Sequence, residues 1–264
     1  MITLLTTLEP TTELFKVVDK TGLISRVIHT RDELDQVSDA IMLLINWPYI
    51  LQPDFIARQR VVLNVHNSLL PRYRGRHAFT WAILNGEREL GFSLHRVVAA
   101  IDAGEVFAQT AFALEVEEDV NDAFRRGAEL LNSWLPGTLL DWAEGRLVAH
   151  PQDERHASSF RRRHAEDNWL MSFDRAEQVR DLIRAVAPPY TSGGMCRTAQ
   201  GEILHFASSQ VVDSVERGEP GRILAIDKLG ISVACAAGIV WLVPVERELL
   251  GRLCTGDMLV AEVL

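Results

Sequence analysis

The sequence has few cysteines, and they follow no pairing pattern. Its 264 residues contain three, Cys196, Cys235 and Cys254, without a Cys-x-x-Cys spacing or an even-numbered framework. This usage argues against a disulfide-rich secreted protein and fits a reduced, cytoplasmic compartment. None lies beside a histidine in the sequence, so we expect packed or surface thiols rather than reactive ones.

Long apolar runs and basic charge are also scarce. No stretch approaches the roughly 20 apolar residues of a membrane helix. Residues 1–15 lack the basic start of a signal peptide and predict a strand followed by a helix. The formal net charge is −9, and acids directly follow the one basic cluster, in Phe160–Asp167 (FRRRHAED). Because polyanion-binding surfaces are normally basic, we expect neither a membrane nor a nucleic acid as partner.

Two groups of binding motifs are missing as well. No Gly-x-Gly-x-x-Gly follows the first expected strand, which argues against a dinucleotide-binding protein. No His-Glu-x-x-His and no Cys/His ligand spacing occurs, so the sequence predicts no metal site.

What is present is an alternation of apolar runs and helical patterns. Strands are predicted in residues 1–7, 24–30, 39–47 and 61–66, with a helix within residues 11–22. Continuous apolar runs such as AIMLLI are typical of strands covered on both faces. The alternation predicts an α/β fold with a parallel sheet and helices packed outside it.

The second half of the sequence predicts two helices separated by a polar connector, and then a series of short strands. A helix is predicted from Asp119, with Val120, Phe124, Leu131 and Leu135 on one core-facing stripe. A polar connector, residues 146–168, and a helix with Val179, Leu182, Ile183 and Val186 on one face come next. From Gly193 short β-runs predict a small barrel. We therefore expect domains at 1–150 (catalytic), 151–190 (linker and helix) and 191–264 (β-barrel).

One strand ends in polar residues where an apolar run would be expected. In VVLNVH, Asn64 and His66 share one face of the strand, because side chains alternate. The carboxyl ends of parallel strands are where α/β sheets bind ligands. Asp102, flanked by small residues in AAIDAGEV, is the acid that a later loop can bring to them.

These three residue types suit acyl chemistry. An amide can stabilise an oxyanion, an imidazole can move a proton, and a carboxylate can orient that imidazole. With no serine or cysteine beside them, the pattern predicts direct attack of an external nucleophile on an acyl carbon. An isolated Asn-x-His also fits a hydrogen-bonded histidine of the core or its rim, and spacing alone leaves that alternative open. His95, His150, His156, His164 and His205 are interpreted as solvated or structural.

A longer, ordered pattern surrounds these residues: NVHNSLLPRYRG, then WAILNGERELGFSLHRV, then IDAGEVFAQ. It resembles the 10-formyltetrahydrofolate-dependent formyltransferases. That family includes methionyl-tRNA, glycinamide ribonucleotide and sugar N-formyltransferases. The similarity runs from about Trp47 to the end of the chain and weakens after Val245. Within the family, LHRVVAAIDAGEVFAQ is nearest to the formyltransferase half of the enzyme that formylates UDP-aminoarabinose.

The resemblance implies a Rossmann-like formyltransferase domain with a small C-terminal, OB-like barrel, and 10-formyltetrahydrofolate as formyl donor without a metal. It implies that Asn64 stabilises the oxyanion, that His66 handles a proton and that Asp102 is its acidic partner. The family holds the pterin by backbone groups. By position, the two segments that do so here are Tyr49, Ile50 and Leu51 on one side, and Val98, Ala99 and Ala100 on the other.

The expected function is formyl transfer to a small primary amine, with a nucleotide-linked amino sugar as the first candidate. Methionyl-tRNA formyltransferase, a formyltetrahydrofolate hydrolase and a catalytically silent binding subunit remain alternatives. The tRNA reading conflicts with the charge of −9, because phosphates are held by lysine and arginine. The acceptor and the oligomeric state, with a dimer as one option, stay open.

Overall fold

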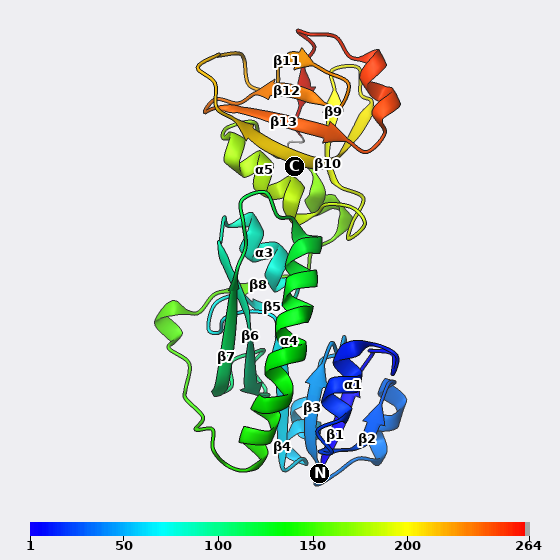
Figure 1. The fold of residues 1–264 in the computed structure, drawn as a ribbon, viewed down its shortest axis with the longest axis vertical. Coiled ribbons are helices and arrows are strands. Elements are labelled where there is room, and N and C mark those ends of the chain that lie inside the picture. The colour runs from blue at the N-terminus through cyan, green and yellow to red at the C-terminus, as the bar shows by residue number, and fades with distance from the viewer. Residues whose placement is uncertain (262–264) are drawn as a thin grey trace. The chain divides into compact units, whose positions relative to one another are not determined.

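The computed structural model describes residues 1–261 and divides into two compact units (Figure 1). Unit 1 contains residues 1–78, 89–113 and 125–161. Unit 2 contains residues 79–88, 114–124 and the chain from residue 162 onward. Each unit has its own sheet, and each is described by itself.

Unit 1 is built on a six-stranded sheet in the order β2-β1-β3-β4-β6-β7. The first four strands run parallel, and β6 and β7 extend the sheet antiparallel. The predicted Rossmann-like α/β fold is thereby confirmed, with an antiparallel edge that the sequence pattern did not specify. The strands are β1 (Ile2–Thr6), β2 (Ile24–Ile28), β3 (Ile41–Ile45), β4 (Val61–His66), β6 (Glu89–Arg96) and β7 (Val106–Ala113).

The apolar runs of these strands form the core, as their lack of polar alternation predicted. β1 is buried along its whole length, and four of the five residues of β3 are buried. One cluster joins the strands to Phe55 and Leu51 and includes Trp47 and Val97 at its margin. It therefore anchors the chain after β3 and after β6, the two strands that flank β4.

Two helices begin with recognisable caps, α1 (Glu13–Asp19) and α4 (Val120–Ala143). Thr12 accepts a hydrogen bond from the backbone N–H of Phe15 at the start of α1, as N-cap residues do. Asp119 accepts from the backbone N–H groups of Asn121 and Asp122 at the predicted start of α4. On the predicted stripe of α4, Phe124 is partly exposed and the others are buried. The helices of unit 1 are α1 (Glu13–Asp19), η1 (Arg31–Gln36) and α2 (Pro53–Ala57). Helix α3 (Ala78–Leu84) falls in unit 2 from Phe79 onward, and α4 (Val120–Ala143) belongs to unit 2 up to Phe124 and to unit 1 from Arg125.

Unit 2 has a six-stranded antiparallel sheet in the order β11-β12-β13-β10-β9-β14. The two edge strands meet, because the backbone N–H of Leu259 donates to the carbonyl of Gly221 and that of Ile223 to Asp257. The sheet thus curls into the small barrel predicted for this region. Its elements are η3 (Ala165–Asn168), α5 (Ala176–Ala185), β9 (Gly194–Thr198), β10 (Ile203–Val212), β11 (Ile223–Ile226), β12 (Ile231–Ala234), β13 (Ile239–Pro244), η4 (Arg247–Arg252) and β14 (Leu259–Val260).

Helix α5 packs on this barrel by the face that the sequence predicted. Val179, Ile183 and Val186 are fully or almost fully buried. The contact is close at Gly194, where a Cβ would lie 2.4 Å from the Cδ1 of Ile183. A larger residue at Gly194 would require the Ile183 side chain to shift.

Candidate active site

The end of β4 carries Asn64 and His66, and both belong to unit 1. Opposite them runs β6, where Asn64 pairs with His95 and His66 with Ser93 in the antiparallel ladder. His66 is buried and Asn64 is partly buried. The structure therefore places both predicted residues at the carboxyl end of a strand that is parallel to β3.

One ring nitrogen of His66 is held by the loop that follows β4. Its Nε2 lies 2.9 Å from the carbonyl oxygen of Tyr73. A carbonyl only accepts, so Nε2 carries the proton. The backbone N–H of Tyr73, which has a positive φ of 59°, donates to the hydroxyl of Ser158 over 2.9 Å. The other ring nitrogen, Nδ1, is 3.7 Å from Oδ2 of Asp102.

Asp102 reaches the site from a tight turn after β6. Its backbone has a φ of 51°, in the left-handed region that only glycine adopts freely. Within this turn, Oδ2 of Asp102 accepts the backbone N–H of Gly75 at 2.8 Å, and Gly104 passes close to Arg96. A Cβ on Gly104 would lie 1.9 Å from the Arg96 carbonyl oxygen. Small residues beside Asp102 were the signal that predicted this loop.

His95 is the fourth residue of the group, and the sequence interpretation did not include it among the site residues. The sequence interpretation of His95 as a solvated or structural histidine agrees with its burial, since it is 1 % exposed. It did not indicate the hydrogen bond to Asn64, with Nε2 3.1 Å from the amide Nδ2. The same nitrogen is 3.6 Å from Oδ1 of Asp102. Burial lowers the pKa of His95 to about 4, so its ring is neutral at pH 7. Its strand register against β4 identifies it, and register is not visible in a single sequence.

The distances from Asp102 to the two imidazoles are longer than direct hydrogen bonds. Catalytic hydrogen bonds are often long before substrate binds and then shorten. A bridging water also spans such a gap. The cluster thus brings together an amide donor, two imidazoles and one carboxylate, with Asp102 between His66 and His95.

A segment far along the chain supports these loops. After α4 the chain returns through η2 (Glu154–His156) to β8 (Ser159–Phe160), which pairs with β5 (Arg74–Gly75). Gln152 donates through Nε2 to the carbonyls of Asp102 and Gly104, both at 2.7 Å. Its Oε1 accepts from Arg74, whose Nη2 is 2.8 Å away.

Arg74 is itself fixed from two sides. Its buried guanidinium forms a two-pronged pair with Glu154, with Nη2–Oε1 at 2.7 Å and Nη1–Oε2 at 3.0 Å. The backbone N–H of Arg74 donates to the carbonyl of Ser158. Gln152 and Arg74 therefore tie the Asp102 turn to the loop that holds His66.

The segments expected to hold a pterin lie beside a common apolar cluster. Trp47 and Leu51 belong to the same apolar cluster as Val97. Leu51 is buried, whereas Tyr49 and Ile50 are exposed. Val98 is partly buried, and Ala99 and Ala100 are exposed. Exposed apolar side chains next to Asp102, with Ile101 among them, suit the face of a heterocyclic ring.

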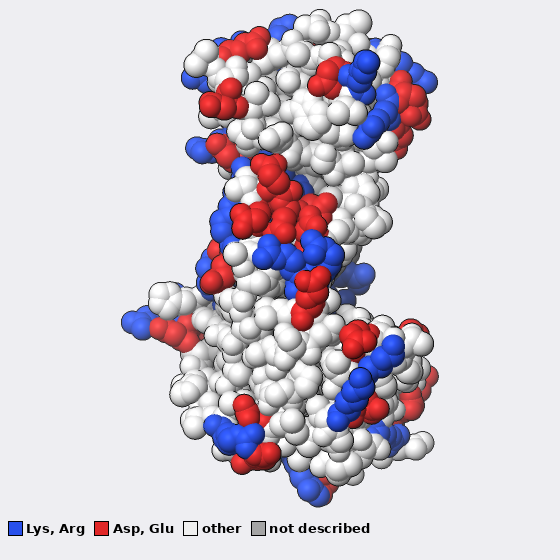
Figure 2. Space-filling model, in the orientation of Figure 1, with Lys and Arg blue, Asp and Glu red and all other residues white. Residues whose placement is uncertain are grey.

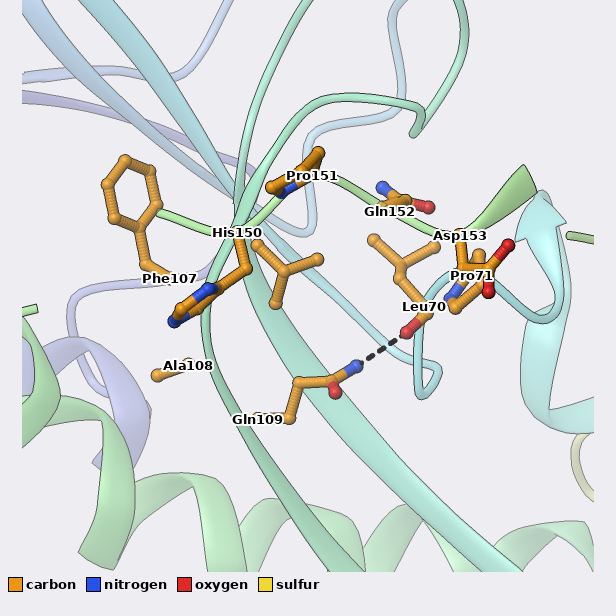
Figure 3. Close-up of a pocket in the computed structure, with 10 residues that line it drawn as sticks. Leu70, Pro71, Phe107, Ala108, Gln109, His150, Pro151, Gln152 and Asp153 are labelled. Atoms are coloured by element: carbon orange, nitrogen blue, oxygen red, sulfur yellow. Dashed lines mark hydrogen bonds between the residues drawn. The ribbon is translucent and has the colours of Figure 1, made fainter. Parts of the chain in front are cut away.

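A shallow groove of about 300 Å³ lies on unit 1 beside the support of the Asp102 turn. Figure 3 shows Phe107 and His150 on one part of its lining and Gln152 and Asp153 on another, with Gln109 donating to the Leu70 carbonyl. Gln152 is shared between this groove and the turn. Within residues 1–261, no group of three or more His, Cys, Asp or Glu side chains is placed to hold a metal ion.

Two sequence models of one family match the chain. The model described as formyl transferase matches residues 15–139, and that described as formyl transferase, C-terminal domain, matches residues 165–250. The chain belongs to the formyltransferase family. The first match contains Asn64, His66, His95 and Asp102, and the second contains α5 and most of the barrel.

Solved structures share the fold of this formyltransferase at low identity. WlaRD, a sugar 3N-formyl transferase solved in the presence of dTDP and 5-N-formyl-THF, is 15 % identical with a TM-score of 0.75; the match covers 93 % of this chain and 97 % of that one. An N-formyltransferase from Helicobacter canadensis, solved with folinic acid and dTDP-3-aminofucose, is 13 % identical with a TM-score of 0.71, covering 92 % and 98 %.

A third similar structure has a different acceptor in its name. The methionyl-tRNA formyltransferase from Clostridium thermocellum is 18 % identical with a TM-score of 0.59, and the match covers 81 % of this chain and 94 % of that one. The described part of this formyltransferase contains no helix of the length and apolarity that a bilayer crossing requires.

Proposed function

We propose that this formyltransferase moves a formyl group from 10-formyltetrahydrofolate to the primary amine of a small acceptor, a nucleotide-linked amino sugar. The observation that carries the proposal is the convergence of Asn64, His66 and Asp102 at the end of β4. Asp102 lies 3.7 Å from His66 and 3.6 Å from His95, and His95 contacts the amide of Asn64 at 3.1 Å. An amide, an imidazole and a carboxylate at one point suit direct attack of an amine on an acyl carbon.

In this mechanism Asn64 donates an amide N–H to the formyl oxygen as negative charge develops there. The new bond joins the amine nitrogen to the formyl carbon, and the bond from that carbon to the folate nitrogen breaks. The attacking nitrogen loses one proton, and the leaving folate nitrogen gains one. Asp102 and His66 handle this exchange.

The hydrogen bonding of His66 restricts how it takes part. Because Nε2 is occupied by the Tyr73 carbonyl, only Nδ1 is available to exchange a proton. Nδ1 faces Asp102 across 3.7 Å, so the proton passes between these two groups directly or through one water. His66 therefore acts as proton carrier, and Asn64 is the oxyanion donor.

The donor site that we propose lies between the Tyr49–Leu51 and Val98–Ala100 segments. Support comes from their shared cluster and from the exposed side chains of Tyr49 and Ile50. Backbone groups of both segments would hold the pterin, and Ile50 would cover one of its faces. The position beside Asp102 would place the formyl group near Asn64.

The choice of an amino sugar rests on the similar structures and on charge. Two of them were solved with dTDP or a dTDP-linked amino sugar, and the match covers nearly all of each. The net charge of −9 opposes a polyanionic tRNA. Figure 2 shows acidic and basic side chains interspersed over the face in view. The three unpaired cysteines also fit our expectation of a cytoplasmic enzyme.

The test is an acceptor panel. The enzyme is incubated with 10-formyltetrahydrofolate and, separately, UDP-linked 4-amino sugars, dTDP-linked 3- and 4-amino sugars, methionyl-tRNA and buffer alone, while tetrahydrofolate release is followed. We expect fast release with one nucleotide-linked amino sugar and formylated product by mass spectrometry. Preferential turnover of methionyl-tRNA would replace the proposed acceptor. An equal rate in buffer alone would indicate a hydrolase, and no turnover with any acceptor would favour a silent subunit.

A further inference from the structure

His95 lies outside the Asn-x-His pattern, yet it contacts the amide of Asn64 directly. The two residues are cross-strand partners in the pairing of β4 with β6. His95 is 1 % exposed, and its Nε2 is 3.1 Å from Nδ2 of Asn64. A buried polar contact of this kind fixes the geometry of both partners.

The hydrogen bonds of His95 identify which of its nitrogens carries the proton. Nδ1 is 2.9 Å from the carbonyl oxygen of Arg96, which can only accept, so Nδ1 is protonated. Burial keeps the ring neutral by lowering the pKa to about 4, and a neutral ring has one N–H. Nε2 therefore presents a lone pair, and the amide nitrogen of Asn64 donates to it.

This assignment leaves one orientation for Asn64. Rotating the amide by half a turn would place its oxygen against the Nε2 lone pair, so two acceptors would face each other. With Nδ2 directed at His95, the second N–H of that nitrogen is available to another acceptor. We infer that His95 is a positioning residue that locks the amide of Asn64 so that its remaining N–H points at the acyl oxygen. The inference rests on the proposed function, in which Asn64 is the oxyanion donor.

Because Nε2 of His95 carries a lone pair, the two histidines have different roles. Oδ1 of Asp102 lies 3.6 Å from Nε2 of His95, but two acceptors form no hydrogen bond. Nδ1 of His66, 3.7 Å from Asp102, also has a lone pair while that ring is neutral. Once Nδ1 takes up the proton that the amine loses, it becomes a donor to Asp102, and the proton can pass between these two groups. One histidine orients the amide and the other moves the proton.

The first test reads the tautomer and does not depend on activity. The full-length protein is labelled with ¹⁵N-histidine, long-range ¹H–¹⁵N spectra are recorded at pH 7, and His95→Gln identifies the signals of His95. We expect a neutral ring protonated on Nδ1 with an unprotonated Nε2. A ring protonated on Nε2, or a doubly protonated one, would overturn the inference, because it could not accept from Asn64.

The second test separates orientation of Asn64 from general support of the fold. His95→Leu removes the acceptor, and His95→Gln keeps one in its side-chain oxygen. With the acceptor found in the panel, we expect His95→Leu to lower kcat about tenfold or more with KM for 10-formyltetrahydrofolate unchanged, and His95→Gln to retain more of the rate.

The decisive comparison is made in an Asn64→Ala background. There His95→Leu should cost less than about twofold, because the group that it orients is gone. A loss as large as in the wild-type background would refute the inference. If the wild-type protein transfers no formyl group at all, the proposed function fails, while the tautomer still decides whether His95 orients Asn64.

Discussion

Replacing Gln152 by alanine isolates the support of the Asp102 turn from the reacting groups. Gln152 donates two hydrogen bonds to this turn, to the carbonyls of Asp102 and Gly104. It touches neither Asn64 nor His66 in these contacts. The substitution leaves every proposed reacting group in place. It removes these two hydrogen bonds to the turn and the two that Arg74 donates to Oε1 of Gln152, while the hydrogen bond from the backbone N–H of Gly75 to Asp102 remains.

The magnitude follows from two opposing terms. The two bonds contribute about 0.5–1.5 kcal/mol each, together about 1–3 kcal/mol. A non-glycine residue with a positive φ, as at Asp102, costs about 1–3 kcal/mol. Because these quantities are equal in size, we expect the turn to relax when Gln152 is removed. At about 1.4 kcal/mol per tenfold, kcat should fall about 5- to 150-fold.

The assay is steady-state tetrahydrofolate release with the acceptor from the panel, combined with thermal unfolding. Gln152→Glu is the matched variant: it keeps an oxygen for Arg74 but places a carboxylate oxygen against two carbonyl oxygens. It should lose activity at least as strongly as Gln152→Ala. Gln59→Ala is the control, because Gln59 also bonds backbone groups, at Val37, Ala40 and Phe55, but away from the site. It should lower stability without lowering kcat.

The reasoning would be refuted by a Gln152→Ala enzyme with unchanged kcat and a lowered melting temperature. That result would mean that the turn holds its shape without Gln152. Equal losses of kcat in Gln59→Ala and Gln152→Ala would refute it as well, since the loss would then report general destabilisation.

Three further predictions concern other parts of the site. Asn64→Ala, His66→Ala and Asp102→Ala should each lower kcat at least about a hundredfold, while folate binding, measured by fluorescence titration, is retained. Double variants should lose less than the product of the single losses, and a fully active His66→Ala enzyme would exclude His66 as proton carrier. Ile50→Asp should weaken folate binding by placing a charge on an apolar wall, and unchanged affinity would contradict the donor site proposed here. Gly104→Ala should lower both kcat and the melting temperature, because its Cβ would meet the Arg96 carbonyl. Gly137→Ala in α4 is the control: its Cβ would have nothing within 4 Å, so it should raise helix stability by about 1 kcal/mol. A Gly104→Ala protein more stable than Gly137→Ala would contradict the close approach of Gly104 to Arg96.

Some features of this fold could be predicted because neighbouring residues in the sequence determine them. Apolar runs mark β1, β3 and β4, and Asp119 marks the start of α4. Asn64 and His66 could be paired because alternation along one strand puts them on one face. Asp102 could be added because small neighbours allow its positive φ.

The rest of the site depends on contacts between distant segments. His95 reaches Asn64 only because β6 runs antiparallel to β4 in one register, and a shift by one residue would turn it to the other face of the sheet. Gln152 lies 50 positions after Asp102, in a connector without periodicity. Its polar composition resembles that of a solvated linker, so no local pattern distinguishes its role.

The return of residues 150–161 to the site has a consequence for how such a protein can be divided or recombined. A gene fragment ending at residue 150 would encode Asn64, His66, His95 and Asp102 but neither Gln152 nor Ser158, which hold the turns around them. The encoded fragment would contain the reacting groups without the residues that hold them in position. A domain exchange between relatives transfers this site whole only if the crossover lies beyond Arg161, after the chain has completed β8. A crossover at the end of α4, at Ala143, would separate the reacting groups from the residues that hold their turns.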